Sequence, residues 1–384
     1  MSAAQWEPAR RILCVRLDNM GDVLMCTPAM RALRESAPGR SITLLASASG
    51  AAVAPFIPEI DDVLLYAAPW MKSSRAQDAA GDLAMAQTLR EHAFDAAVIF
   101  TTYSQSALPA AMLCHLAGIP LRLAHCRENP YHLLTDWIPD PEPEQGVRHE
   151  VRRQLELVGA IACRSEDERM SFAVHEEDRL WMQRRLAGLG IAAGRPWILM
   201  HPGATAQSRR YPATHWSRVI AQLADDGLDI VVSGDSSEAE LIATIMQAAE
   251  PGASRVHSMA GQLDLGQLGA AISLASVVVS NNTGPAHMAA AIGTPLVDLY
   301  ALTNPQHTPW QVANRVLFHD VPCRFCYKSI CPQGHNDCLA KVEPSQVAAA
   351  VHSLLQAAPD DGHHDAEVIS FRQWRERRAQ GAAR

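Results

Sequence analysis

The hydrophobic positions in the first half of the chain form short apolar runs that alternate with segments of helical spacing. The runs predict strands at 12–17, 41–46, 63–66, 96–100 and 121–123, and segments such as 83–92 predict helices between them. The stretch 138–148 is too rich in proline and charge for a regular element, and a helix is expected from about residue 149. Strands that alternate with helices predict a parallel sheet covered on both faces.

The same pattern starts again after a glycine- and proline-rich break at 188–196. Strands are predicted at 197–200, 229–233, 277–280 and 296–300, and helices at 216–223, 238–249, 265–274 and 285–292. The sequence therefore predicts two doubly wound α/β domains, residues 1–187 and 195–358, followed by an arginine-rich tail, 359–384.

Length and composition limit the class of protein. A chain of 384 residues exceeds one ordinary domain, and 48% hydrophobic residues exclude global disorder. A net charge of -8 gives no basic field for nucleic acid, so no nucleic-acid partner is expected. Neither a signal peptide nor a membrane-spanning segment is predicted, which leaves the cytoplasm as the expected location. Five scattered cysteines are expected to be buried, reduced thiols: Cys14, Cys26, Cys114, Cys126 and Cys163.

The loop that follows the first strand, residues 18–22, offers a candidate base. Gly21 permits a tight turn, and Asp22 is expected in the first turn of the next helix, where the helix dipole favours an ionised carboxylate. Asp22 could therefore take a proton from a bound hydroxyl. The alternative is that Asp22 only caps the helix.

Two loops in the second domain could bind an anion. Residues 201–212 place Arg209 and Arg210 after a glycine-containing turn, which suits phosphate recognition. Residues 280–287 lead from a strand into a helix, so the amides of Thr283 and Gly284 could form an anion site. The alternatives are a solvated surface loop and a helix cap without a ligand. No dinucleotide-binding glycine fingerprint follows a strand, which argues against an NAD-dependent dehydrogenase, and the absence of a P-loop motif argues against a P-loop NTPase. The chain also has no Asp-x-Asp pair, so a metal-held nucleotide diphosphate is not expected.

Residues 12–33, 201–220 and 277–305 resemble the signature segments of glycosyltransferase family 9, the ADP-heptose:lipopolysaccharide heptosyltransferases. The resemblance implies a GT-B fold, two Rossmann-like doubly wound domains facing a cleft, with the acceptor in the first domain and the nucleotide-diphospho-sugar in the second. It implies an inverting transfer that needs no cofactor, of heptose from ADP-heptose to a lipopolysaccharide core or related glycan. A lipid-linked acceptor would bring peripheral contact with the inner face of the cytoplasmic membrane.

The resemblance also assigns roles to residues. It makes Asp22 the catalytic base and Arg209, where the family more often has lysine, the residue that steadies the leaving diphosphate. It implies a donor site made of Gly21, His201, Gly203, Ala204, Thr205, Gly234, Glu238, Asn282, Thr283, Gly284 and His287. Asn282 departs from the aspartate usual in the family, which removes a charged acceptor beside the donor sugar but keeps an amide that can accept a hydrogen bond. A nucleotide-sugar epimerase or hydrolase, or a non-catalytic sugar-nucleotide-binding relative, remain alternatives.

Two further groups of residues have open interpretations. Cys323, Cys326, Cys331 and Cys338 lie within 16 residues and could hold a structural zinc, form a redox-sensitive loop or remain four free thiols. A group of basic residues in the first domain could meet an anionic acceptor or form a solvated face: Arg122, Arg127, Arg148, His149, Arg152 and Arg153.

Overall fold

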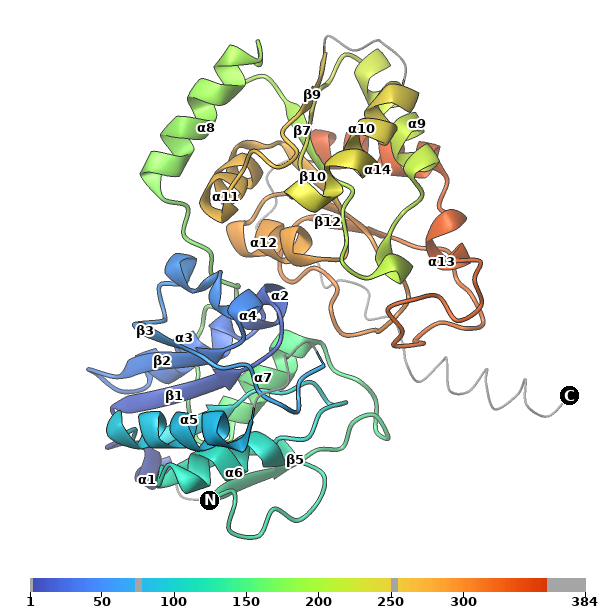
Figure 1. Cartoon of the computed structure of the whole chain (residues 1–384). Coiled ribbons are helices and arrows are strands. Elements are labelled where there is room, and N and C mark those ends of the chain that lie inside the picture. The colour runs from blue at the N-terminus through green and yellow to red at the C-terminus, as the bar shows by residue number, and fades with distance from the viewer. Residues whose placement is uncertain (1–2, 73–77, 250–254, 358–384) are drawn as a thin grey trace, which may run out of the picture. The chain divides into compact units, whose positions relative to one another are not determined.

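The computed structural model describes residues 3–72, 78–249 and 255–357, which form two compact units, 3–171 and 172–357 (Figure 1). The predicted tail, 359–384, lies outside the described residues. No helix in the described ranges is long and apolar enough to cross a membrane.

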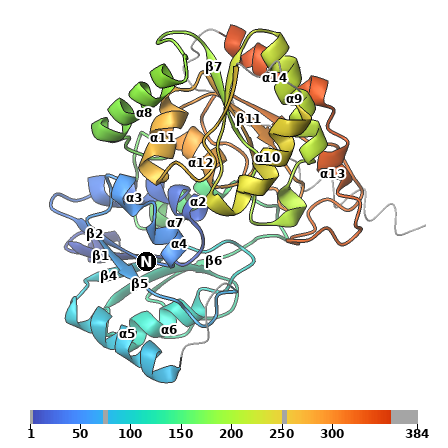
Figure 2. The same ribbon diagram turned by 45° about the horizontal axis from the view of Figure 1, so that its top comes forward.

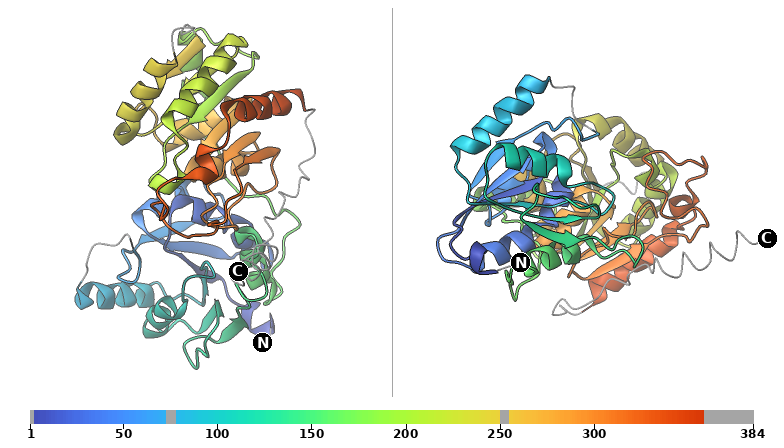
Figure 3. Two further views of the ribbon diagram at one scale, coloured as in Figure 1. Left: turned by 90° about the vertical axis from the view of Figure 1, so that its right-hand side faces the viewer. Right: turned by 90° about the horizontal axis from the view of Figure 1, so that it is seen from below.

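The first unit is a six-stranded parallel sheet with helices on both faces. Its strands follow the order β3-β2-β1-β4-β5-β6, and their bounds are β1 Arg11–Arg16, β2 Ser41–Ala46, β3 Asp62–Leu65, β4 Ala96–Ile99, β5 Leu121–Cys126 and β6 Asp136–Pro139. Helices α3 and α7 pack together on one face, and α5 and α6 pack together on the other (Figures 1 and 3). The helices are α1 Ala3–Trp6, α2 Met20–Leu24, α3 Thr27–Glu35, α4 Ala48–Ala51, η1 Ala54–Phe56, α5 Ala79–Glu91, α6 Leu108–Leu116 and α7 Glu150–Gly159.

The second unit repeats this topology. Its parallel sheet has the order β12-β11-β10-β7-β8-β9, with β7 Trp197–His201, β8 Asp229–Val232, β9 Val256–Ser258, β10 Val277–Asn281, β11 Leu296–Leu299 and β12 Asn314–Leu317. Helices α9, α10 and α14 cover one face, and α8, α11 and α12 lie on the other (Figure 2). The helices are α8 Glu176–Gly188, η2 Gln207–Arg209, α9 Ala213–Asp225, η3 Ser236–Glu238, α10 Ala239–Ala248, α11 Leu265–Leu274, α12 Gly284–Ile292, α13 Asp337–Ala340 and α14 Pro344–Gln356.

Local sequence signals set several helix ends. Asp264 begins α11 by accepting a hydrogen bond from the Gln267 amide at 2.8 Å, while the Gln267 side chain accepts one from the Asp264 amide at 3.2 Å. Gly293 ends α12 in the left-handed conformation, with φ 87°, which glycine adopts without steric cost.

Each sheet has one point at which the strand order reverses, between β1 and β4 in the first unit and between β7 and β10 in the second. In open α/β sheets, the loops that leave the carboxyl ends of the strands diverge at this point and form a crevice for a ligand. The three loops chosen from the sequence leave β1, β7 and β10, so all three begin at a reversal point.

The prediction of two parallel doubly wound sheets is confirmed. The sequence pattern missed the outer strands β6, β9 and β12, which are short and mostly half-buried, so their apolar signal is weak. The expectation that 138–148 contains no regular element is wrong at its start, because β6 extends to Pro139; proline is tolerated there at the edge of a sheet. The five scattered cysteines are buried free thiols, as predicted.

Helix α8 belongs to the second unit, although the predicted boundary at 187 left it in the first domain. It buries Met182 and Leu186 and packs against α11. The division between units therefore lies before this helix, at residues 171 and 172.

Replacement of Gly269 by alanine tests how tightly the start of the second unit packs against α11. A Cβ atom at 269 would lie 2.4 Å from Cε1 of the Phe172 ring, and such overpacking costs about 1–3 kcal/mol against a gain of about 1 kcal/mol in helix propensity. We expect Gly269→Ala to lower the free energy of unfolding, measured in urea, and Phe172→Leu in the same chain to recover it. Gly188→Ala, where nothing lies within 4 Å of the added Cβ, is the control and should cause no loss. Equal stability of the two alanine variants would contradict the packing argument.

Candidate active site

The end of β1 in the first unit is organised around the buried guanidinium of Arg16. Its Nη1 donates to Glu150 Oε1 at 2.7 Å, its Nε lies 2.9 Å from Asp18 Oδ2, and its Nη2 lies 3.3 Å from Asp22 Oδ1. Gln154 Nε2 donates to the same Glu150 oxygen at 2.8 Å. Arg16 therefore links the candidate base to α7 and holds three carboxylates around one cation.

The charges in this group shift one another's proton affinities. Burial alone lowers the pKa of Arg16, but Asp18, Glu150, Cys26 and Asp22 together raise it well above its usual range. Burial and the neighbouring carboxylates raise the pKa of Asp18 to about 6, although Arg16 and the hydrogen bond from Gln105 lower it. Arg16 thus remains charged, and its charge favours the ionised form of the carboxylates beside it.

Asp22 lies in the first turn of α2, as predicted, and it also caps that helix. Its Oδ2 accepts a hydrogen bond from the Asn19 amide at 3.2 Å, and Gly21 is buried in the same turn. The predicted capping contact is confirmed, and the role of Asp22 as a base stays a prediction. The Asp22 carboxylate lies 3.3 Å from Arg16 Nη2 and 3.2 Å from the Asn19 amide, whereas the Asp18 oxygens lie 2.9 Å from Arg16 Nε and 2.6 Å from Gln105 Nε2.

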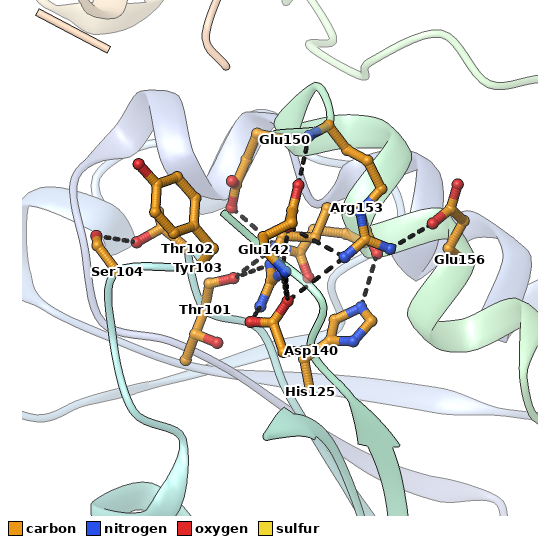
Figure 4. Close-up of polar contacts among 12 residues, drawn as sticks. Thr101, Thr102, Tyr103, Ser104, His125, Asp140, Glu142, Glu150, Arg153 and Glu156 are labelled. Atoms are coloured by element: carbon orange, nitrogen blue, oxygen red, sulfur yellow. Dashed lines mark hydrogen bonds and ion pairs between the residues drawn. The ribbon is translucent and has the colours of Figure 1, made fainter. Parts of the chain in front are cut away.

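A second buried network lies beside this group, around Thr101, His125 and Asp140 (Figure 4). Arg153 donates to both oxygens of Asp140 at 2.8 and 2.9 Å and to the Thr101 carbonyl at 2.9 Å. Burial and the charges of Arg153 and Arg148 lower the pKa of His125 to about 4, so its ring is neutral near pH 7. The network fixes α7, which carries Glu150, against the ends of β4 and β5.

Two of the arginines that were predicted to meet an anionic acceptor are instead buried and hydrogen-bonded within the first unit. Arg153 is 1% exposed and is paired as described, and the guanidinium of Arg122 donates to the carbonyls of Leu133 and His132 at 2.7 and 2.8 Å. For these two residues, the prediction of an acceptor contact and the prediction of a solvated face are both wrong. Their guanidinium groups instead form hydrogen bonds with buried carboxylates and carbonyls.

In the second unit, Asn281 joins the loops that leave β7 and β10. Its Nδ2 donates to the carbonyls of Pro202 and Gly203 at 2.7 and 3.3 Å, and its Oδ1 accepts from the Tyr211 amide at 3.1 Å. The two predicted anion-binding loops are therefore held together by one buried amide. Asn281 was not among the predicted site residues.

Four of the predicted donor-binding residues meet at the ends of β7 and β8. Glu238 Oε2 lies 3.7 Å from His201 Nε2, and a Cβ atom at Gly203 or Gly234 would lie 1.8 or 2.9 Å from the Glu238 carboxylate. The Glu238 carboxylate therefore occupies the space that a side chain at position 203 would need, and at position 234 Ile242 Cδ1 lies closer still, 2.5 Å from such a Cβ. Burial raises the pKa of Glu238 and lowers that of His201 to about 4, so His201 is a neutral hydrogen-bonding group.

The loop after β7 brings Arg209 to the start of α12, the helix that follows β10. Arg209 Nη1 lies 3.4 Å from the Asn282 carbonyl oxygen, and Thr283 is the N-cap residue of the helix. Pro285, which lacks an amide hydrogen, follows Gly284, and first-turn amides such as that of Gly284 have no partner within the helix. The arrangement combines a cation with a helix N-terminus, which is suited to a phosphate group.

The remaining predicted residues are less closely grouped. His287 is buried in α12, with its ring 6.2 Å from that of His307. Ala204 is buried and its carbonyl accepts from Arg210 Nε at 2.7 Å, whereas Thr205 is exposed. A further residue that sequence analysis missed is Asp298, a fully buried carboxylate 2.9 Å from Asn282 Nδ2. The sequence signal for Asp298 was the presence of a charged residue within the apolar run 296–300.

The four clustered cysteines lie in a segment that contacts the arginine loop. Ser208 donates to the carbonyls of Lys328 and Ser329 through its hydroxyl at 2.7 Å and its amide at 3.0 Å. Burial and the thiols of Cys331 and Cys326 raise the pKa of Cys323. Within the described ranges, however, no three His, Cys, Asp or Glu side chains are arranged to hold a metal ion.

Comparisons with known proteins identify the family of the chain. The model of glycosyltransferase family 9 (heptosyltransferase) matches residues 83–336. Lipopolysaccharide heptosyltransferase 2 of Escherichia coli K12 is 25% identical over 360 residues, which cover 90% of this chain and 98% of that protein.

Solved structures show the same fold. A family 9 glycosyltransferase from Veillonella parvula has a TM-score of 0.75 at 22% identity, covering 92% of this chain and 98% of the other. The E. coli ADP-heptose lps heptosyltransferase II has a TM-score of 0.70 at 23% identity, covering 90% and 98%. The GT-B fold class expected from the sequence is therefore confirmed. Since the family model matches well over half of its residues, this chain belongs to glycosyltransferase family 9 and is a glycosyltransferase.

Proposed function

We propose that the protein transfers heptose from ADP-heptose to a lipopolysaccharide core or a related glycan, with inversion at the anomeric carbon. The observation that carries this proposal is the placement of Asp22 at the reversal point of the first sheet, held by Arg16 at 3.3 Å. The similarity to lipopolysaccharide heptosyltransferase 2 over nearly its full length supports the choice of donor and acceptor.

The reaction follows from the groups at the two reversal points. Asp22 takes the proton of an acceptor hydroxyl while that oxygen forms a bond to the anomeric carbon. The bond between this carbon and the diphosphate oxygen breaks, and its electron pair leaves with the ADP. Arg209 and the Gly284 amide stabilise the negative charge that develops on the diphosphate, so we propose that no metal ion is needed for this step.

The donor site divides between two groups of residues in the second unit. His201, Gly203, Gly234 and Glu238 form the group at the ends of β7 and β8, which we assign to the nucleoside. Arg209, Thr283 and Gly284 form the group at the start of α12, which we assign to the diphosphate. Asn281 joins the two groups, so a bound nucleotide would contact loops that are already fixed to each other.

Replacement of the proposed base tests the mechanism. We expect Asp22→Asn to lower kcat by about a hundredfold or more because the amide cannot accept a proton, with less than about a threefold change in the Kd for ADP-heptose. Transfer to added acceptor is the readout, and ADP release without acceptor would reveal a hydrolase. Asp18→Asn is the matched control and should lose less, since both Asp18 oxygens are engaged by Arg16 and Gln105. Parental turnover by Asp22→Asn, or a larger loss in Asp18→Asn, would refute the assignment.

We also propose that the acceptor is lipid-linked and that the protein works in the cytoplasm, touching the inner face of the membrane peripherally. Support comes from three large apolar side chains that are exposed on the neighbouring helices α5 and α6: Leu83 at 64%, Met112 at 44% and Leu116 at 47%. A contiguous patch of exposed apolar groups marks a contact surface, and we propose that these three side chains form one.

Sedimentation with lipid vesicles tests this surface. We expect the parent protein to co-sediment with vesicles of mixed zwitterionic and anionic lipid, and a Leu83→Ser, Met112→Ser, Leu116→Ser variant to lose at least about half of that binding, since apolar burial supplies the free energy. Turnover on a delipidated acceptor should be the same for both proteins. Equal sedimentation of parent and variant would contradict the assignment.

The cysteine segment leads to a further proposal, a structural zinc held by Cys323, Cys326, Cys331 and Cys338. Support comes from their spacing in the sequence, although no three of the described side chains are arranged as metal ligands. Metal analysis of the purified protein is expected to give about one equivalent of zinc, and Cys323→Ser with Cys326→Ser should lose it. Less than about a tenth of an equivalent of zinc or iron would remove the metal and leave a redox-sensitive loop or free thiols.

A further inference from the structure

Asn282 occupies the position at which the resemblance led us to expect an aspartate, and its side chain has a fixed orientation. Its Nδ2 donates to the His307 carbonyl at 2.8 Å and to Asp298 Oδ2 at 2.9 Å. A carbonyl oxygen can only accept a hydrogen bond, so the nitrogen must face His307 and the amide oxygen must face the opposite way.

The amide oxygen of Asn282 faces away from these two partners. Among the described residues no hydrogen bond to this Oδ1 is found, and although Asn282 is only 4% exposed, the oxygen is not one of the fully buried polar atoms that lack a partner. The backbone carbonyl of the same residue lies 3.4 Å from Arg209 Nη1. Asn282 therefore has an acceptor beside the cation that we assign to the diphosphate.

Asp298 supplies the carboxylate that Asn282 lacks. It lies within β11, directly opposite Ser280 of β10, and is fully buried. Its Oδ2 accepts from Asn282, while its Oδ1 has no hydrogen-bond partner among the described residues. Burial raises the pKa of Asp298 to about 7, although Asn282 and Arg209 lower it. An isolated buried carboxyl is costly, and its pairing with the Asn282 amide offsets part of that cost.

We propose that Asp298 is a positioning residue of the donor site: it holds the Asn282 amide so that the amide oxygen, at the position that the resemblance places beside the donor sugar, faces a sugar hydroxyl. The inference rests on the proposed function, because this role of Asp298 requires that Asn282 lie beside the donor sugar. A neutral amide oxygen accepts a hydroxyl hydrogen without adding negative charge beside the diphosphate.

A double-mutant cycle tests the pair. Asn282→Asp places two carboxylates at hydrogen-bond distance, which is unfavourable for both. We expect it to weaken ADP-heptose binding by about tenfold or more and ADP binding by less than about threefold, measured by calorimetry. Asp298→Asn alone should have a smaller effect, and the double variant should bind ADP-heptose at least about threefold more tightly than Asn282→Asp. Asp229→Asn is the control for loss of a buried carboxylate, because Asp229 pairs with Arg195 and Arg255 at the other end of the sheet.

Thermal unfolding without nucleotide provides a readout that does not depend on the donor. Asn282→Asp is expected to lower Tm by about 3 °C or more, and Asp298→Asn in the same chain to recover at least half of the loss. If the Tm change of the double variant equals the sum of the changes in the two single variants, the proposed pairing is wrong. Equal losses of ADP and ADP-heptose affinity would overturn the sugar contact. If the parent binds ADP-heptose no better than ADP, the proposed donor is wrong. The binding measurements are then repeated with the sugar nucleotide that binds best in a panel. Additive Tm changes, or equal losses of affinity for that sugar nucleotide and its nucleotide, would again overturn the inference.

Discussion

Both sheets are parallel and covered by helices on two faces, and this arrangement determines where polar chemistry can occur. Strands buried on both faces are almost wholly apolar, as β10 is with Val277, Val278 and Val279. Polar groups that must reach a ligand are therefore confined to the strand ends, and the reversal of strand order opens one such place in each unit. Arg16, at the last position of β1, and Asn281, at the last position of β10, both occupy this boundary between core and loop.

A charge placed at this boundary must be matched by opposite charges inside the same unit. Arg16 is completely buried, and the removal of one member of a buried ion pair commonly costs about 3–5 kcal/mol, because the remaining charge is left without compensation. The position of Asp22 therefore depends on Glu150, which lies 134 residues from Arg16 along the chain. A residue that never touches a substrate can in this way determine how well the candidate base is oriented.

The sequence was sufficient for the parts of the site that are local. The position of Asp22 at the start of a helix followed from the apolar run before it and the glycine beside it, and Arg209 and Thr283 were found because each follows a buried strand. Partners distant in sequence were not predictable. Nothing local pairs Arg16 with Glu150, or Arg153 with Asp140, and these buried pairs were instead read as surface charge or not noticed. Asp298 was overlooked because a single carboxylate in an apolar run does not alter its periodicity.

The hydrogen bonds between Ser208 and the carbonyls of Lys328 and Ser329 join two parts of the second unit that are 120 residues apart. Arg209 follows Ser208 directly, so its position depends on the segment 323–338, which contains the four clustered cysteines. Oxidation or alkylation of these thiols would therefore be expected to change the affinity for the nucleotide and to leave the catalytic groups in place. The orientation of Arg209 thus depends on residues that lie about 120 positions further along the chain.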